Sequence, residues 1–415
     1  MSEGAVQAPK AWSSAFMVAA AGLFANVLNL GVSVLIARLL NPVQYGAYSQ
    51  MLGIFFIVAL PGSALSVAVV RRATWYLVRD DEALVQRWQR RLNQRILRMA
   101  GYFSLVALAV SFALAYWLGH RSWIAVWLIT LAAISWAVLN VDRALIQARQ
   151  RYGALAANLA LEGITRTIFM VLFSPLGVTG IAAGLFIAIV CARLHARALI
   201  RPRRVIDGPT LEHTGVTTDL VVALSSLAVL AVLQFADVFL VGHYQNQVAG
   251  PYSAISQVAK TVVYAAIILG GFLLPEAALA ERQGRAALRP LVIAGVLLAL
   301  PAGVMLAFSA LWGHGMLEVV FGARYASQSG SLVGLVVAMT LLAASTLMIT
   351  FHLGLGRRLP SAWLVLTTLG GLWYLNQSHG VPHELVNRNI ALQAIVLCGL
   401  IFLAVPSLHR SKANR

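Results

Sequence analysis

Ionisable side chains inside long apolar stretches are the residues of this sequence that could do chemistry. One apolar run carries Asn158, Glu162 and Arg166 at intervals of four, so all three share one face if the run is helical. At 1.5 Å per residue, Arg166 lies about 17 Å from the end of that run. Charges this deep in an apolar helix usually face a bundle interior or a cavity. Glu162 and Arg166 therefore form an internal ion pair, or Arg166 lines a cavity for an anionic group.

Two later apolar runs repeat this pattern. One carries Gln234 and Asp237, and the next carries Gln257, Lys260 and Tyr264 on one helical face. A short loop joins the two runs, so we expect antiparallel neighbours. Asp237 lies about 8 Å and Lys260 about 12 Å below that loop at the helical rise. The two charges are placed to pair, either as a structural salt bridge or as a switch coupled to a substrate or an ion.

The first apolar run carries a milder polar stripe, formed by Asn26, Asn29 and Ser33, and ends at Arg38. Such stripes often make hydrogen bonds between helices. Arg193, near the end of the sixth run, can extend its charged group out of the membrane.

Together these polar faces predict a hydrated cleft between the two halves of the chain. Its charge suits an anionic head group better than an organic cation. The candidate site residues are the cations Arg38, Arg166 and Lys260, the acids Glu162 and Asp237, and the polar residues Asn26, Asn29, Asn158, Gln234, Gln257 and Tyr264.

Motifs for catalysis are missing from the sequence. There is no GxxxxGK(S/T) phosphate loop, HExxH, GxSxG or Cys/His cluster. His379, His383 and Glu384 share one short loop without metal-ligand spacing, and Cys191 and Cys398 lie in apolar runs. We therefore expect no enzyme activity, no cofactor and no metal.

The composition indicates a membrane protein. Of the 415 residues, 60% are hydrophobic and 11% are charged, and the mean hydropathy is +0.80. Apolar runs of about 20 residues, long enough to cross a bilayer as a helix, recur along the whole chain. The net charge of +17 fits retention of basic loops inside and contact with anionic inner-leaflet lipid. We therefore do not expect nucleic acid as a partner.

The sequence predicts an all-α integral membrane protein with about twelve spans. Lys and Arg gather at both ends and in every second loop, including a cytoplasmic segment with Arg143, Arg149 and Arg151, so both termini are expected inside. The predicted spans are 14–37, 46–69, 101–119, 122–141, 155–174, 178–196, 219–242, 252–274, 291–312, 332–353, 361–376 and 390–407.

A short repeat divides the chain. The sequence GAYS at residues 46–49 opens the second span, and GPYS at residues 250–253 opens the eighth. Six spans of the same orientation follow in each half, which is typical of a parallel repeat. We expect six-helix bundles at 1–196 and 219–415, joined by a cytoplasmic linker at 197–218.

The longest loop between spans predicts a basic amphipathic helix at 80–99. Leu84, Trp88, Leu92 and Ile96 recur every four residues, and arginines fill the other face. Such a helix is expected to lie flat on the anionic inner leaflet, with docking of a partner protein as the alternative.

Three stretches resemble the Wzx-type polysaccharide flippases. Residues 37–48, ARLLNPVQYGAY, resemble the family's ARxLGPxxYGxY opening. Residues 237–242, DVFLVG, followed by GPYS, are similar to its "D-apolar-G…GxYS" stretch, and FGARY at 321–325 resembles its FGxxY segment. Asn41 in place of Gly and Pro251 inside the GxYS element depart from the pattern. Twelve spans fit this branch better than the fourteen expected of lipid II flippases.

The resemblance implies a two-lobed transporter of the multidrug/oligosaccharidyl-lipid/polysaccharide exporter superfamily. Such proteins move an undecaprenyl-diphosphate-linked glycan across the bacterial inner membrane by alternating access, for O-antigen, capsule or exopolysaccharide assembly. It further implies work alongside a polysaccharide polymerase and chain-length machinery, and an ion gradient for which Glu162 and Asp237 are candidate coupling groups.

Other functions remain open on the sequence. A drug or metabolite antiporter of the same superfamily would favour acidic cavity residues. A major-facilitator transporter would place its longest loop between spans six and seven, whereas this chain has it between spans two and three. A membrane glycan polymerase or ligase usually carries larger outward loops.

Overall fold

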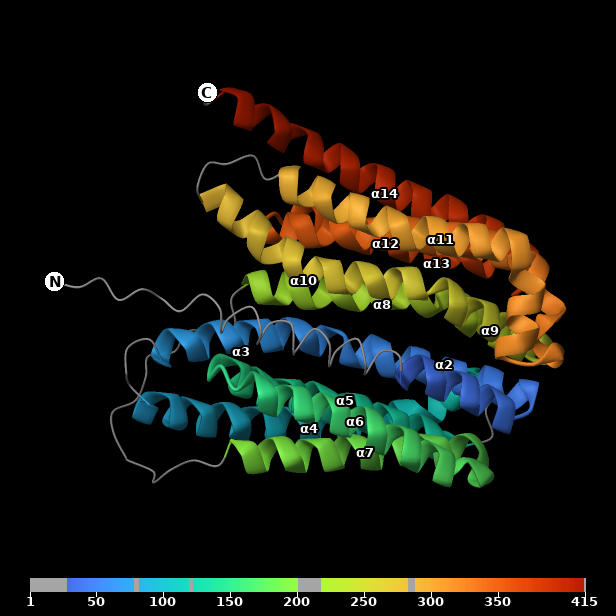
Figure 1. The fold of residues 1–415 in the computed structure, drawn as a ribbon, viewed down its shortest axis with the longest axis horizontal. Coiled ribbons are helices and arrows are strands. Elements are labelled where there is room, and N and C mark those ends of the chain that lie inside the picture. Colours follow the sequence, from blue (N-terminus) through green and yellow to red (C-terminus); the bar gives the residue numbers. More distant parts are fainter. Residues whose placement is uncertain (1–27, 78–81, 119–121, 201–217, 283–287, 414–415) are drawn as a thin grey trace. The chain divides into compact units, whose positions relative to one another are not determined.

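The computed structural model describes residues 28–77, 82–118, 122–200, 218–282 and 288–413. Every secondary-structure element that these residues form is an α-helix or a 3-10 helix, and none of the described residues lies in a β-strand (Figure 1). The predicted all-α fold is therefore confirmed. Among the described residues, nine helices are long and apolar enough to cross a membrane, and the protein is a multi-pass membrane protein.

Two compact units make up the chain. Unit 1 contains residues Met1–Leu39, Ile54–Tyr116 and His120–Gly215. Unit 2 contains Leu40–Gly53, Trp117–Gly119 and Val216–Arg415. The second unit thus includes the first part of helix α2 (Pro42–Ala59), which comes from the N-terminal half of the sequence.

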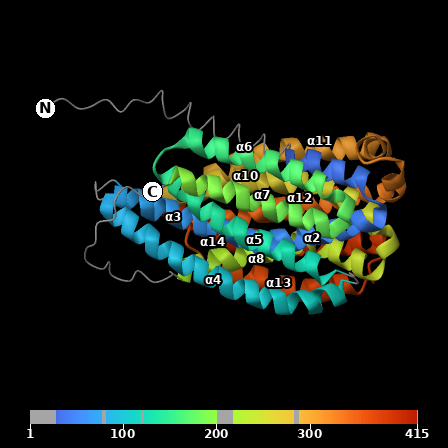
Figure 2. The ribbon, with the colours of Figure 1, turned by 90° about the horizontal axis from the view of Figure 1, so that it is seen from below.

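Unit 1 is a helical bundle. After the helix Leu28–Leu39, α5 packs against α7 and α3, and α6 packs against α7; α7 and α5 run side by side in Figure 2. Its further helices are α3 (Pro61–Leu77), α4 (Glu82–Trp117), α5 (Trp123–Ala148), α6 (Tyr152–Leu172), the short η1 (Ser174–Leu176) and α7 (Gly177–Leu199).

Unit 2 is organised around α12, which packs against α10, α11 and α14, while α13 packs against α8 and α14. Two thirds (67%) of the most apolar window in the segment Ala323–Gly354, which contains α12, is buried, compared with 11% for Arg87–Trp117 of α4. Helix α12 is therefore central in unit 2, and α4 is peripheral in unit 1. The elements are α8 (Thr218–Tyr244), η2 (Asn246–Val248), α9 (Ala249–Ala259), α10 (Thr261–Arg282), α11 (Leu288–Val320), η3 (Ala323–Ser331), α12 (Leu332–Gly354), α13 (Leu359–Asn376) and α14 (Pro382–Ala413).

Local sequence explains several helix starts. Pro42, Pro61 and Pro382 are the first residues of α2, α3 and α14, where a missing N–H costs no helical hydrogen bond. Ser122 precedes α5, and its hydroxyl accepts a hydrogen bond from Ala125 N at 3.2 Å, which satisfies one of the free donors of the first turn.

Each predicted span overlaps described helices, but spans 46–69 and 252–274 each cover parts of two helices, α2 and α3 and then α9 and α10, and the total of twelve spans stays a prediction. Of the first predicted span only residues 28–37 are described. The predicted span 122–141 ends too early, because α5 continues to Ala148 and buries both Asp142 and Arg143. Arg143 therefore lies inside a helix, and its placement in a loop is wrong. Its charge is compensated by a carboxylate of α6, a contact that a search for uncharged runs does not detect.

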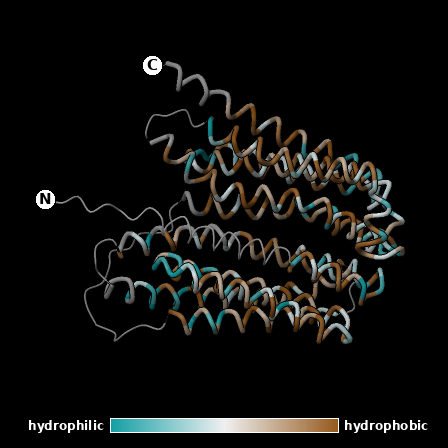
Figure 3. The backbone as a smooth tube through the Cα atoms, viewed as in Figure 1, coloured by the Kyte–Doolittle hydropathy of each residue, from teal (hydrophilic) through white to brown (hydrophobic). Residues whose placement is uncertain are grey.

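Helix α4 also differs from the prediction. Residues 80 and 81 lie outside the described residues, but from Glu82 to Trp117 the chain forms one helix of 36 residues. Its length is about 54 Å, well beyond the ~30 Å of bilayer hydrocarbon. The polar and apolar parts of this helix are visible in Figure 3. The arginine-rich segment is thus the unbroken continuation of a span, and Arg197 of α7 donates to Asn93 Oδ1 at 3.1 Å, so it packs on protein as well.

Candidate functional site

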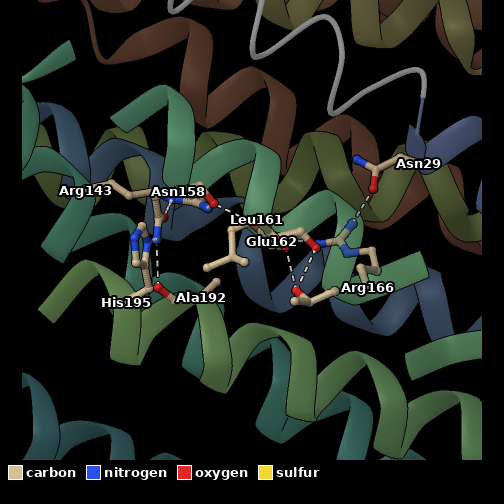
Figure 4. A network of polar contacts seen from close by, with 9 residues as sticks. Asn29, Arg143, Asn158, Leu161, Glu162, Arg166, Ala192 and His195 are labelled. Atoms are coloured by element: carbon tan, nitrogen blue, oxygen red, sulfur yellow. Dashed lines mark hydrogen bonds and ion pairs between the residues drawn. The ribbon is translucent and has the colours of Figure 1, made fainter. Parts of the chain in front are cut away.

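A buried charge network lies in unit 1 and is centred on Glu162 of α6 (Figure 4). One carboxylate oxygen lies 2.7 Å from Arg143 Nη1, and the other contacts Arg166 Nη2 one turn further along the helix. All three side chains are largely buried, with exposed fractions of 7%, 8% and 13% for Arg143, Glu162 and Arg166. Two guanidinium groups against one carboxylate give the network a net charge of +1.

Arg143 is held by Asn158 as well as by Glu162. Its Nε donates to Asn158 Oδ1 at 2.7 Å and its Nη2 donates to the Asn158 carbonyl oxygen at 3.3 Å. The Asn158 amide nitrogen in turn donates to the Ala192 carbonyl at 2.7 Å and lies 3.1 Å from His195 Nδ1. Asn158 therefore ties α5, α6 and α7 together (Figure 4), a role beyond the polar lining expected from the sequence.

Arg166 is held more loosely. Its Nη1 donates to Asn29 Oδ1 at 2.7 Å, and its guanidinium carbon lies 5.9 Å from the centroid of the Phe55 ring. Its Nε has no hydrogen-bond partner in the described part of the chain. Arg166 therefore retains a free donor beside a carboxylate that it shares with a second arginine.

A second shared carboxylate lies in unit 1, near the C-terminal ends of α5 and α7. Asp142 Oδ2 lies 3.7 Å from Arg193 Nε and 3.5 Å from Arg197 Nε. The sequence predicts for Arg193 a charged group that extends out of the membrane and gives it no partner. Asp142 is far from Arg193 and Arg197 along the sequence, so their spacing does not predict this contact. The packing of α5 on α7 brings the carboxylate and the two guanidinium groups together.

In unit 2 the structure brings Asp237 and Lys260 together. Lys260 Nζ lies 3.5 Å from Asp237 Oδ1, and both side chains are almost completely buried. Asp237 Oδ2 accepts hydrogen bonds from Tyr252 at 3.2 Å and Ser256 at 3.0 Å, and Lys260 Nζ lies 4.2 Å from the centroid of the Phe235 ring. The pair is neutral, and Lys260 sits where α9 ends and α10 begins.

The remaining candidates are Gln234, Gln257, Tyr264, Arg38 and Asn26. Gln257 hydrogen-bonds to Tyr264, while Gln234 is buried and its Nε2 has no partner among the described residues. Arg38 is exposed and lies about 14 Å from Asn29 along their common helix. Asn26 lies outside the described residues.

The stretches that carried the family resemblance meet in unit 2. The Tyr45 ring lies 6.3 Å from Phe321 and 5.3 Å from Tyr325 between centroids, and Tyr325 donates to the Leu40 carbonyl at 3.3 Å. A Cβ on Gly46 would lie only 2.7 Å from the Cβ of Ala249, so α2 and α9 approach each other too closely for any larger residue.

Gly322 supports this cluster from the other side. Its φ of +106° is a conformation that glycine adopts without strain. The chain turns there from α11 into η3, which places Phe321 and Tyr325 against Tyr45. These motif residues therefore position helices.

No protein-family model and no curated protein matches the sequence. Solved structures do match. An inward-facing multidrug resistance MATE family transporter of the MOP superfamily has a TM-score of 0.72 and 12% identity, over 93% of this chain and 96% of that chain. The lipid II flippase MurJ, in an inward closed conformation, has a TM-score of 0.66 and 12% identity, over 94% of this chain and 87% of that chain.

A third match is a MOP superfamily transporter from Pyrococcus furiosus, described as having a binding pocket of reverse polarity. Its TM-score is 0.59 and its identity 15%, over 95% of both chains. At these identities the comparisons show the fold alone. The chain has the fold of MOP-superfamily transporters.

Proposed function

We propose that this protein is a flippase that moves an undecaprenyl-diphosphate-linked oligosaccharide across the bacterial inner membrane for surface polysaccharide assembly. The observation that carries the proposal is the excess positive charge of the buried network in unit 1. Arg143 and Arg166 share one carboxylate, Glu162. A cation inside an apolar bundle is costly unless an anion offsets it, and the diphosphate of the substrate supplies that anion.

Arg166 is the residue that we assign to the diphosphate. A guanidinium group offers a planar set of donors that matches phosphate oxygens. Arg166 keeps 13% of its side chain exposed, and its buried Nε has no hydrogen-bond partner among the described residues. The Phe55 ring beside its guanidinium group supplies an apolar neighbour, and a charged hydrogen bond is stronger where the surroundings are apolar.

The other candidates have supporting roles in this proposal. The neutral Asp237–Lys260 pair adds no net charge; we assign it to helix packing or to coupling with an ion gradient, as an alternative to direct binding by Lys260. Arg38 supplies an exposed cation. A polysaccharide polymerase and chain-length machinery are the expected partners of such a flippase, and anionic lipid is expected around its basic segments.

The second candidate function is export of a drug or metabolite, as in the multidrug MATE transporters that share the fold. An organic cation would need an excess of buried carboxylates. The buried charge network of unit 1 has the opposite sign, which favours the flippase.

Deletion of the gene in its host tests the proposal. Lipid-linked glycans are extracted and analysed by mass spectrometry. We expect a complete undecaprenyl-diphosphate repeat unit to accumulate on the cytoplasmic side. Wild-type protein should reverse this and Arg166→Gln should not, while Arg95→Gln, the same change at an exposed arginine of α4, should behave as wild type. Unchanged lipid-linked and surface glycans, together with new sensitivity to cationic drugs, would favour the exporter instead.

A further inference from the structure

The two arginines that share Glu162 differ in how they are held. Arg143 makes one contact to Glu162 and two to Asn158, so every nitrogen of its guanidinium group has a partner. Arg166 contacts Glu162 and Asn29, and its Nε has none in the described chain. Arg166 is also the more exposed, at 13% compared with 7%. The network therefore has one arginine whose three nitrogens all have partners and one whose Nε has none among the described residues, and Figure 4 shows their contacts.

Asn158 is what fixes Arg143. It is completely buried, and its own amide is oriented by the Ala192 carbonyl and by His195 Nδ1, both on α7. With the amide nitrogen committed to α7, the amide oxygen points at Arg143 Nε. The position of Arg143 is thus set by a neighbouring helix and does not depend on Arg166.

We propose that Arg143 is the permanent counter-ion of Glu162, positioned by Asn158 and His195, and that Arg166 is the exchangeable partner, which leaves Glu162 to bind the diphosphate of the substrate. This inference rests on the proposed function, because it requires an anionic substrate. It assigns to Arg143, Asn158 and His195 a positioning role that their spacing along the sequence does not predict.

The physical reason is the cost of an isolated buried charge. If Arg166 were the sole partner of Glu162, its departure would leave an unpaired carboxylate in a medium of low dielectric constant. With Arg143 in place, Glu162 stays neutralised throughout. Glu162 then competes with the substrate for Arg166. The strength of the Glu162–Arg166 ion pair therefore sets the affinity for the substrate.

Binding measurements on the full-length protein in nanodiscs test this mechanism with undecaprenyl diphosphate as the probe. Arg166→Gln should weaken binding at least about tenfold, since a charged hydrogen-bond pair is lost. Glu162→Gln should tighten binding by about tenfold, because the competing carboxylate is gone. Arg143→Gln should weaken binding by a similar factor, because Glu162 then holds Arg166 alone.

The double variant Arg143→Gln/Glu162→Gln separates positioning from a purely structural role. We expect it to bind the probe at least as tightly as the wild type, since no carboxylate remains to hold Arg166. Arg197→Gln is the matched control, because it removes one of the two arginines that share Asp142 in the same unit. It should leave the affinity unchanged.

The outcomes are distinct. If the wild type does not bind undecaprenyl diphosphate, the proposed function fails and the inference with it. If the wild type binds and Arg143→Gln binds equally well, or the double variant does not recover, the inference is wrong and the proposed function stands. If Arg143→Gln does not fold, Glu162→Gln decides alone: equal or weaker binding contradicts the inference. Size-exclusion profiles establish folding for every variant.

Discussion

Removing one partner of the buried pair Asp237–Lys260 should destabilise unit 2 strongly, and removing both should not. The two side chains are 0% and 1% exposed, so water cannot replace a lost partner. We consider Lys260→Met, Asp237→Leu and the double variant. Each replaces a polar side chain by an apolar one of similar size.

The burial of the pair sets the size of the loss in stability, and the contacts left to each charge set which single variant loses more. Breaking a buried ion pair by removing one partner costs about 3–5 kcal/mol, whereas replacing both by apolar residues is often close to neutral. Without Lys260, Asp237 keeps the hydroxyl donors of Tyr252 and Ser256. Without Asp237, the Lys260 ammonium group keeps the face of the Phe235 ring within the described part of the chain, and no carboxylate there lies close enough to pair with it. Asp237→Leu should therefore be the more damaging single change.

Thermal unfolding of purified protein in detergent measures the effect. For a unit of roughly 200 residues, a loss of about 3–5 kcal/mol lowers the apparent Tm by about 6–20 °C. We expect both single variants in this range and the double variant well above them. Single variants as stable as the wild type, or a double variant no better than the worse single variant, would refute the reasoning.

Three further changes test other contacts by the same measurement of apparent Tm. Gly46→Ala should cost about 1–3 kcal/mol, since its Cβ would overlap α9, while Gly31→Ala, with no atom within 4 Å of the new Cβ, should not destabilise; an equal loss at both would contradict the packing. Tyr325→Phe should cost about 0.5–1.5 kcal/mol through the lost bond to a main-chain carbonyl, and no change would show that this bond is not needed. Arg197→Gln should cost less than about 1 kcal/mol, because Arg197 is 37% exposed and such pairs are screened; a loss above 3 kcal/mol would mean that Asp142 depends on it.

Much of the fold is predictable from the sequence because each apolar run must satisfy its backbone hydrogen bonds internally, and a helix does this within one segment. The ends of the runs are less predictable. A charge normally marks the membrane boundary, but Arg143 is buried because Glu162 compensates it. That compensation comes from another helix and leaves no local signal. The unbroken α4 was missed for a related reason, since a change from polar to apolar composition looks like a boundary although helical hydrogen bonds continue through it.

The candidate site divides in the same way. The spacing of Glu162 and Arg166 on one helix predicts their contact, and two runs joined by a short loop predict that Asp237 meets Lys260. The second partner of Glu162 comes from α5, and the pairing of Asp142 with α7 likewise depends on helix packing. Neither follows from spacing along the chain. The motif residues Tyr45 and Tyr325 show that family signatures can be structural, because they pack against each other in unit 2.

Translocation by the purified protein tests the central claim most directly. Wild-type protein and Arg166→Gln are reconstituted into sealed liposomes that carry an undecaprenyl-diphosphate-linked oligosaccharide, and a membrane-impermeant enzyme modifies the glycan in the outer leaflet. We expect wild-type protein to expose nearly all of the glycan, and Arg166→Gln and protein-free liposomes to expose only the outer-leaflet half. Protection of the inner half in wild-type liposomes, with uptake of an organic cation by the same preparation, would contradict the account.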